Sequence, residues 1–275
     1  MARPFRTVLR YLVLVLVAGL MVGPFLWMVS TSMMDQADIF RSPPRWFPER
    51  LNLKNYRAIM DLLPLGGMFL NSFTIALSAT VGQVFSCALA AYAFARMKFR
   101  GHVVLYFVLL ATMMIPPQVT MIPVFLIMKA LGWIDTLYAL IVPAFFGGAF
   151  GTFLLRQFFS TIPMDLEDAA RIDGCGRFRI FWRIVLPLSR PALVTLALFT
   201  FMAYWNDLLG PVIYLSSVGK ATLTIGLANL QSDVMITRYD LLMAGSVLSV
   251  LPILILFIAG QRWFVRGIAM TGLKE

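Results

Sequence analysis

Six long apolar runs, separated by polar segments, limit what this chain can fold into. A helix that crosses the hydrocarbon of a bilayer needs about 20 apolar residues, because it must cover ~30 Å at about 1.5 Å per residue. Sixty per cent of the 275 residues are hydrophobic and 13% are charged, whereas a soluble domain carries about 25% charged residues. The sequence therefore predicts an all-α, polytopic membrane protein, with six transmembrane helices in a single domain over residues 1–275. The expected spans lie at about residues 11–30, 71–95, 103–128, 136–155, 191–209 and 241–264.

The first apolar run also resembles the core of a secretory signal, because Arg3, Arg6 and Arg10 precede it. A signal core has about 7–15 apolar residues and is followed by a small-residue cleavage site. This run is longer, and no A-x-A site follows it. We therefore expect an uncleaved first span.

The distribution of Lys and Arg predicts the orientation. With the N-terminus in the cytoplasm, the cytoplasmic segments hold 15 basic and five acidic residues, which is the whole net charge of +10. The other side holds eight of each. Because basic residues concentrate on the cytoplasmic side, we expect both termini there. The basic residues form no zinc-finger or basic-helix pattern, so we expect no nucleic-acid partner.

The cytoplasmic loop at residues 160–190 has the most distinctive sequence. Pro163 is suited to open a helix, since the first turn needs no N–H from it. Asp165 and Glu167 then place negative charge at the positive end of that helix. Gly174 favours a helix end in the left-handed conformation. We expect a short helix outside the bilayer, followed by an interfacial segment in which apolar residues alternate with Arg177, Arg179 and Arg183.

Two parts of this loop resemble the signature of bacterial ABC importer permeases, E-A-A-x3-G-x9-I-x-L-P. Asp168-Ala169-Ala170 is followed after three residues by Gly174, and after nine more by Ile184-Val185-Leu186-Pro187. Position 168 is Asp where the signature has Glu, although Glu167 lies next to it. Position 176 is Gly where Ser or Thr is common, which removes a helix N-cap worth about 1 kcal/mol.

The rest of the chain is similar to carbohydrate permeases of the maltose and glycerol-phosphate type, in particular to their shorter membrane subunit. The similarity covers nearly the whole sequence. The segments that carry it are Pro24-Phe25-Leu26-Trp27-Met28, Leu70-Asn71-Ser72, Ala90-Ala91-Tyr92-Ala93-Phe94-Ala95-Arg96, Met114-Ile115-Pro116-Pro117-Gln118 and Trp205-Asn206-Asp207.

The resemblance implies an ABC importer permease of type I architecture in the bacterial inner membrane, which forms half of a pathway for a sugar or sugar derivative. The implied partners are a homologous permease subunit in a heterodimer, a cytoplasmic ABC ATPase dimer, an extracytoplasmic solute-binding protein and membrane lipid. The chain has no G-x-x-x-x-G-K-[ST], so it needs no cofactor and is not an enzyme; ATP is bound by the ATPase. The implied ATPase-coupling residues are Glu167, Asp168, Ala169, Ala170, Asp173 and Gly174.

Three polar residues are candidates for lining the pathway. Asp207 and Asn206 end the fifth run, where they either face the pathway or cap a helix at the outer interface. Gln118 follows Pro116-Pro117, and prolines free carbonyl groups that polar side chains or water then satisfy. Kinking without contact to the solute explains the prolines equally well.

Other functions fit the sequence less well. An ABC permease for a non-sugar solute remains the alternative nearest to the resemblance. A secondary transporter needs ion-coupling residues within its spans, and a membrane enzyme needs a cluster such as H-E-x-x-H. The sequence has one histidine, His102, and no such cluster. A channel would not explain the signature loop. Cys87 and Cys175 are expected to be structural and unpaired.

Overall fold

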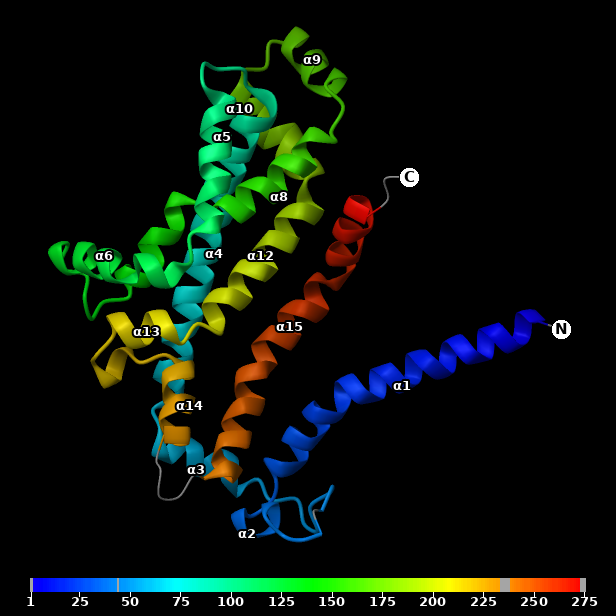
Figure 1. Ribbon diagram of the computed structural model, residues 1–275, viewed down its shortest axis with the longest axis vertical. Coiled ribbons are helices and arrows are strands. Elements are labelled where there is room, and N and C mark those ends of the chain that lie inside the picture. The colour runs from blue at the N-terminus through cyan, green and yellow to red at the C-terminus, as the bar shows by residue number, and fades with distance from the viewer. Residues whose placement is uncertain (1, 44, 233–237, 273–275) are drawn as a thin grey trace. The chain divides into compact units, whose positions relative to one another are not determined.

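A computed structural model describes residues 2–43, 45–232 and 238–272 of the chain, and every regular element in these ranges is helical (Figure 1). Two compact units are present. The first unit comprises the described parts of residues 1–66 and 226–252, and the second unit those of residues 67–225 and 253–275. The prediction of an all-α fold is confirmed.

In the first unit, a short helix donates hydrogen bonds to the segment at the end of a long helix. This unit contains α1 (Ala2–Thr31), α2 (Gln36–Ile39), α3 (Lys54–Leu62) and parts of α14 (Leu223–Ser232) and α15 (Tyr239–Gly272). Asn55 of α3 is buried, and its Nδ2 donates to the carbonyl groups of Ser32 at 3.0 Å and Met34 at 2.8 Å. These bonds satisfy carbonyl groups that a helix end leaves unpaired. The segment that follows the first span is thus fixed to its end.

The second unit is built around α4 (Leu65–Arg96). Its core joins residues 87–92 of α4 to the side chains of Leu155 and Phe159, of Phe181 and Val185, and of Leu196. The helices that supply these residues reach α4 from distant parts of the sequence, so α4 is the axis on which they pack. The remaining elements of this unit, apart from the ends of α14 and α15, are α5 (His102–Ala111), η1 (Thr112–Met114), α6 (Pro117–Ala130), α7 (Tyr138–Ile141), η2 (Val142–Phe146), α8 (Ala149–Ser160), α9 (Asp165–Ile172), α10 (Arg177–Ile180), the π-helix η3 (Phe181–Val185), α11 (Leu186–Leu188), α12 (Arg190–Trp205), α13 (Leu209–Tyr214) and η4 (Val218–Lys220).

Four helical segments of the described chain are long and apolar enough to cross a membrane, and two bent pairs bring the number up to six. The four are Thr7–Thr31, Leu65–Arg96, Tyr138–Ser160 and Tyr239–Arg262. The bent pairs are His102–Met114 with Pro117–Ala130, at 101°, and Arg177–Leu188 with Arg190–Trp205, at 79°.

The third and fifth predicted spans therefore differ from straight helices. In the third, the residue before a proline avoids the helical region, and Ile115 and Pro116 are extended, with ψ of 114° and 135°. Figure 1 shows α6 leaving the line of α5 at this corner. In the fifth, the helix ends at Trp205 rather than near residue 209.

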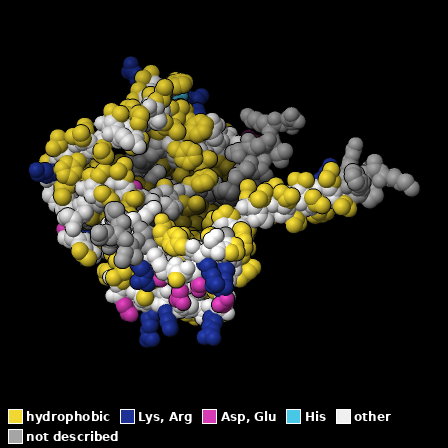
Figure 2. Space-filling model, turned by 60° about the horizontal axis from the view of Figure 1, so that its bottom comes forward, with side chains coloured by type: hydrophobic (Ala, Val, Ile, Leu, Met, Phe, Trp, Pro, Cys, Tyr) yellow, Lys and Arg dark blue, Asp and Glu magenta, His cyan; other side chains and the backbone are white. Residues whose placement is uncertain are grey.

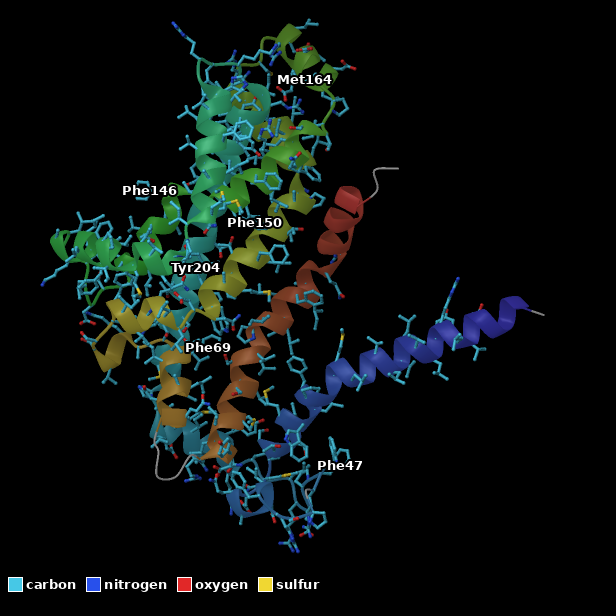
Figure 3. The ribbon with its side chains drawn as sticks, viewed as in Figure 1. Phe47, Phe69, Phe146, Phe150, Met164 and Tyr204 are labelled. Carbon is cyan, nitrogen blue, oxygen red and sulfur yellow. The ribbon has the colours of Figure 1, made fainter. Side chains whose placement is uncertain are left out.

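A break also interrupts the fourth predicted span between η2 and α8. Gly147 has φ +81° and ψ −166°, a conformation that is open essentially to glycine alone. Backbone groups freed at such a break must find partners, because lipid supplies none. Two residues of α4 supply them: Ser86 Oγ donates to the carbonyl group of Phe145, and Gly148 N donates to Cys87 Sγ at 3.2 Å. Phe146, beside the break, is 86% exposed, and Phe150 follows in α8 (Figure 3).

Large hydrophobic side chains lie on the outside of many helices. Figure 2 shows hydrophobic side chains over much of the face that it presents. Val104 and Phe107 of α5 are 66% and 64% exposed, and Val119 and Ile122 of α6 are 67% and 69% exposed. Apolar patches of this extent on a soluble monomer would cause association, whereas lipid covers them without cost.

We expect Gly151→Ala to destabilise the second unit. A Cβ at Gly151 of α8 would lie 2.7 Å from Cys87 Sγ and 3.1 Å from the Leu196 side chain, and overpacking of this kind costs about 1–3 kcal/mol. Gly67→Ala in α4 is the matched control, because nothing lies within 4 Å of its Cβ position. Thermal unfolding of the purified chain in detergent measures both. Equal melting temperatures would contradict the close packing of α8 against α4.

Candidate functional site

The short helix predicted after the fourth span is present as α9. Three acidic residues (Asp165, Glu167 and Asp168) occupy its first turn, where they stabilise the positive end of the helix dipole. Gly174 has φ +78°, and Gly174 N and Cys175 N donate to the carbonyl groups of Arg171 at 3.0 Å and Ala170 at 2.9 Å. Glycine at this position thus ends the helix as the sequence predicts.

Two opposite faces of α9 have different surroundings. Glu167 and Ala170 are 0% and 8% exposed, and their spacing of three residues places them on one face. Leu166, Ala169 and Ile172 share the other face, and Ile172 is 88% exposed. The outward face is therefore apolar and small at its centre, which allows another protein surface to approach closely.

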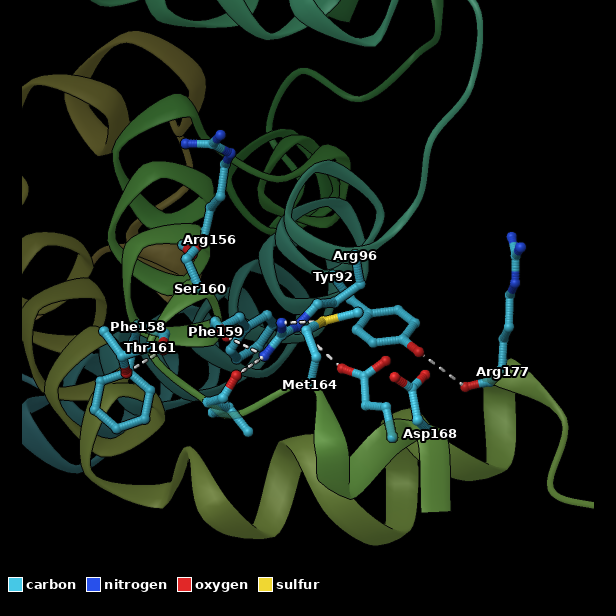
Figure 4. A network of polar contacts seen from close by, with 12 residues as sticks. Tyr92, Arg96, Arg156, Phe158, Phe159, Ser160, Thr161, Met164, Asp168 and Arg177 are labelled. Atoms are coloured by element: carbon cyan, nitrogen blue, oxygen red, sulfur yellow. Dashed lines mark hydrogen bonds and ion pairs between the residues drawn. The ribbon is translucent and has the colours of Figure 1, made fainter. Parts of the chain in front are cut away.

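A buried ion pair holds the inward face of α9. Nε of Arg96, the last residue of α4, lies 3.0 Å from Oε1 of Glu167, and the two side chains are 5% and 0% exposed (Figure 4). Two charges taken out of water are tolerated when they pair with each other and their remaining groups are bonded. The pair therefore fixes α9 to the end of α4.

The same guanidinium also donates hydrogen bonds to carbonyl groups at and just beyond the end of α8. Arg96 Nη2 donates to the carbonyl groups of Phe159 at 2.6 Å and Ile162 at 2.5 Å, and its Nη1 lies 2.6 Å from Met164 Sδ. Phe159 lies in the last turn of α8 and Ile162 two residues beyond its end, and the planar fork of arginine matches several acceptors at once. One side chain thus joins the ends of α4 and α8 to the start of α9.

A second cation, Arg171 of α9 itself, contacts the acidic residues of this helix from the solvent-exposed side. Arg171 Nη1 lies 2.7 Å from Asp168 Oδ1, and its Nη2 lies 3.6 Å from Glu167 Oε2. The Arg171 and Asp168 side chains are 42% and 57% exposed, so water weakens this pair. The six predicted coupling residues therefore divide by position: Glu167 and Ala170 lie inside, whereas Asp168, Ala169, Asp173 and Gly174 are exposed.

The second half of the signature loop packs along α4. Tyr92 Oη donates to the carbonyl group of Arg177 at 3.4 Å, and the Tyr92 ring lies 5.2 Å from the Phe181 ring. The π-helical turn adds about one residue per turn, and Phe181 and Val185 are buried. Gly176 is the N-cap residue of α10 and makes no side-chain bond there, as expected from the missing Ser or Thr.

The candidates for lining the pathway lie in two places. Asn206 Nδ2 donates to the carbonyl group of Met202 at 2.9 Å, and Gly210 N donates to Asp207 Oδ1 at 3.2 Å. Both residues thus make hydrogen bonds at helix ends, and their place on the pathway stays a prediction. Gln118 is exposed in the first turn of α6, and none of the contacts found among the described residues joins it to that pair.

Asp135 is a polar centre that the sequence analysis missed. Its carboxylate accepts hydrogen bonds from Ser217 N at 2.9 Å, Ser217 Oγ at 2.5 Å and Ser216 N at 3.0 Å, and Lys220 Nζ lies 3.2 Å from Oδ2. The bonds from Ser217 and Ser216, with Lys220, hold the pKa of Asp135 well below its usual range. These contacts fix the turn at residues 132–136 to the loop that follows α13.

Arg96 is the other functional residue that the sequence did not single out. In the sequence it is only the last residue of the segment Ala90–Arg96 that carries the family resemblance, with no role of its own. A useful signal was present, because a single arginine at the end of an alanine-rich apolar run is well placed to reach the ends of neighbouring helices. Its partner, however, lies about 70 positions further along the chain.

Comparisons with known proteins agree with this architecture. A sequence model of the family described as "Binding-protein-dependent transport system inner membrane component" matches residues 82–270. The chain is 34% identical over 242 residues to the sn-glycerol-3-phosphate transport system permease protein UgpE of Yersinia pestis, covering 86% of each chain. It is 34% identical over 261 residues to the arabinooligosaccharides transport system permease protein AraQ of Halalkalibacterium halodurans, covering 94% of this chain and 93% of the relative.

A solved structure has the same fold. A chain of a bacterial ABC transporter involved in the import of the acidic polysaccharide alginate superposes with a TM-score of 0.84, at 23% identity, over 95% of this chain and 97% of that chain. This likeness confirms the predicted importer-permease architecture.

We expect Arg96→Met to destabilise the chain far more than Arg171→Met. Removing one partner of a buried ion pair costs about 3–5 kcal/mol, because the other charge stays buried. Arg171 approaches the same carboxylate from a half-exposed position, so its loss should cost less than about 1 kcal/mol. Thermal unfolding in detergent compares the two variants.

The double variant Arg96→Leu with Glu167→Leu provides the control for this experiment. Replacing a buried pair by apolar side chains removes both desolvation costs, so the double variant should recover much of the stability that Arg96→Leu alone loses. An Arg96→Met chain as stable as Arg171→Met would show that the buried pair does not hold α9.

Proposed function

The chain belongs to the family of binding-protein-dependent transport system inner membrane components, and from this premise we propose that it imports a sugar or sugar derivative and binds an ATPase through α9. As a member of this family, it is a multi-pass permease subunit of a binding-protein-dependent ABC importer, and it is not itself an enzyme.

The outward face of α9 supports the ATPase proposal. Ile172 is a large apolar residue that is 88% exposed on a helix whose other face is held by a buried ion pair. An exposed apolar side chain on a rigid helix gives a partner protein both an anchor and a fixed direction. The ATPase subunit binds over Leu166, Ala169 and Ile172, which places α9 and both termini on the cytoplasmic side.

The contacts of Arg96 support a path for the coupling. When two ATPases close on ATP, the docked helices move with them. In this chain α9 is joined by Arg96 to the ends of α4 and α8, so a displacement of α9 reaches both helices. ATP and the solute shift the equilibrium between inward- and outward-open states only through different affinities for those states.

The names of the relatives support the cargo proposal. One is named for arabinooligosaccharides and one for sn-glycerol-3-phosphate, and both of these solutes carry more than one hydroxyl group. The solute of this importer is a polyhydroxylated compound of the same kind. A second, homologous permease subunit supplies the other half of the pathway, and a solute-binding protein delivers the solute from outside.

We expect Ile172→Asp to prevent the ATPase from binding while the chain still folds. A charge in place of this exposed apolar anchor should weaken the interface about tenfold or more, because the residues that anchor an interface contribute about 2 kcal/mol or more. Val218→Asp is the matched control, since Val218 is also apolar and 73% exposed but lies in η4. Co-purification of the ATPase with each tagged chain measures the effect. An Ile172→Asp chain that retains the ATPase would contradict docking on this face.

We also expect the solute-binding protein that co-purifies with the importer to carry a polyhydroxylated ligand. Mass spectrometry of the ligand released on denaturation identifies it. In proteoliposomes, that compound should stimulate ATP hydrolysis by the complete importer, whereas an amino acid should not. An amino acid, peptide or metal ion as the released ligand would contradict the cargo proposal and leave the ATPase proposal standing.

A further inference from the structure

The segment after Gly174 exposes two parallel rows of side chains that the transport function does not use. Phe178 and Trp182 are 67% and 46% exposed, and their rings lie 6.1 Å apart. Arg179 and Arg183, each one position further along, are also exposed. We name these four residues the arginine–aromatic face. Because the opposite side of the segment is anchored through Phe181, the face has a fixed direction.

The arginines of this region have no acidic partner among the residues that the structure describes. The basic residues that form ion pairs in the described part of the chain are Arg45, Arg96, Arg171, Lys220 and Arg238. None of them uses Arg177, Arg179, Arg183 or Arg190. Four guanidinium groups within 14 positions are thus exposed without an acidic partner among the described residues. This concentration of positive charge favours an anionic partner.

The neighbours of the face place it beside membrane-crossing helices. The Trp182 ring lies 6.3 Å from the ring of Phe85, which is 43% exposed and lies 11 positions before the end of α4. That is about 16 Å along the helix. The apolar run of α12 begins directly after Arg190, at Pro191. Arginines therefore alternate with aromatic rings beside the apolar helices α4 and α12.

We infer that the arginine–aromatic face binds the phosphate headgroup of an anionic phospholipid in the cytoplasmic leaflet. The guanidinium forks of Arg179 and Arg183 donate to phosphate oxygens, a pairing that arginine geometry favours. Trp182 and Phe178 supply aromatic rings, a side-chain type that is enriched at headgroup depth. A zwitterionic headgroup carries its own cation, so it competes less well for the same arginines.

A protein partner is the other occupant to consider, and the surroundings favour lipid. A docking face for the ATPase is already present on α9, where the exposed side chains are apolar, small or acidic. The arginine–aromatic face instead carries only positive charge, and its aromatic rings continue onto Phe85 of α4, an apolar helix. The inference goes beyond the proposed function, and its test does not require ATPase docking at Ile172.

The test uses the full-length chain in a zwitterionic detergent, with fluorescent phosphatidylglycerol and phosphatidylcholine as probes. We expect phosphatidylglycerol to bind more tightly, and the variant Arg179→Gln with Arg183→Gln to weaken its binding about tenfold or more, since each arginine near a membrane surface adds about 1 kcal/mol of attraction to anionic lipid. The pair Arg179→Lys with Arg183→Lys keeps both charges but loses the guanidinium forks, so it should weaken the binding less than the glutamine pair does.

A charge-matched control separates a site from bulk attraction. Arg50→Gln with Arg57→Gln removes two exposed positive charges from the first unit and should leave the binding of phosphatidylglycerol unchanged. Equal binding of the two lipids, or equal weakening by the control, would overturn the inference. Displacement of the lipid by inorganic phosphate, but not by chloride at the same ionic strength, would assign the face to free phosphate. Loss of ATPase co-purification with unchanged lipid binding would assign it to the protein partner.

Discussion

A single buried guanidinium determines where the signature helix sits. Arg96 pairs with Glu167 at 3.0 Å and donates to the carbonyl groups of Phe159, in the last turn of α8, and of Ile162, two residues beyond that helix. An arginine and a glutamate are expensive to bury separately, but here their opposite charges lie 3.0 Å apart, and two carbonyl groups accept hydrogen bonds from Arg96 Nη2. Without this arrangement, α9 would be a short helix of eight residues with little to hold it, because helices of that length are marginal in isolation.

The bilayer imposes the second constraint, since backbone groups at membrane depth must find partners within the protein. The chain meets it at the break in the fourth predicted span, where Ser86 and Cys87 of α4 bond to the groups around Gly147 and Gly148. Close approach makes this possible: a Cβ at Gly82 would lie 2.4 Å from the Phe145 ring. The same helix that holds α9 at one end thus supports an irregular segment along its length.

The two halves of the signature loop have different surfaces. The helix α9 exposes Leu166, Ala169 and, at its C-terminal end, Ile172, whereas the segment after Gly174 shows arginines and aromatic rings. Gly174, at φ +78°, separates them by a sharp turn. This division suits a loop that meets a protein with one half and the membrane surface with the other.

The sequence by itself determined what depends on local patterns: the apolar runs, the helix from Asp165 that Gly174 ends, and the absence of a phosphate-binding motif. Only the tertiary structure showed that Glu167 faces inward while Asp168 faces outward, because neighbouring acidic residues look alike until a cation about 70 positions away selects one of them. It also decided the bend at Pro117 and the capping positions of Asn206 and Asp207. Hydropathy and turn chemistry are properties of a few adjacent residues, whereas the pairing of buried charges depends on how distant helices pack.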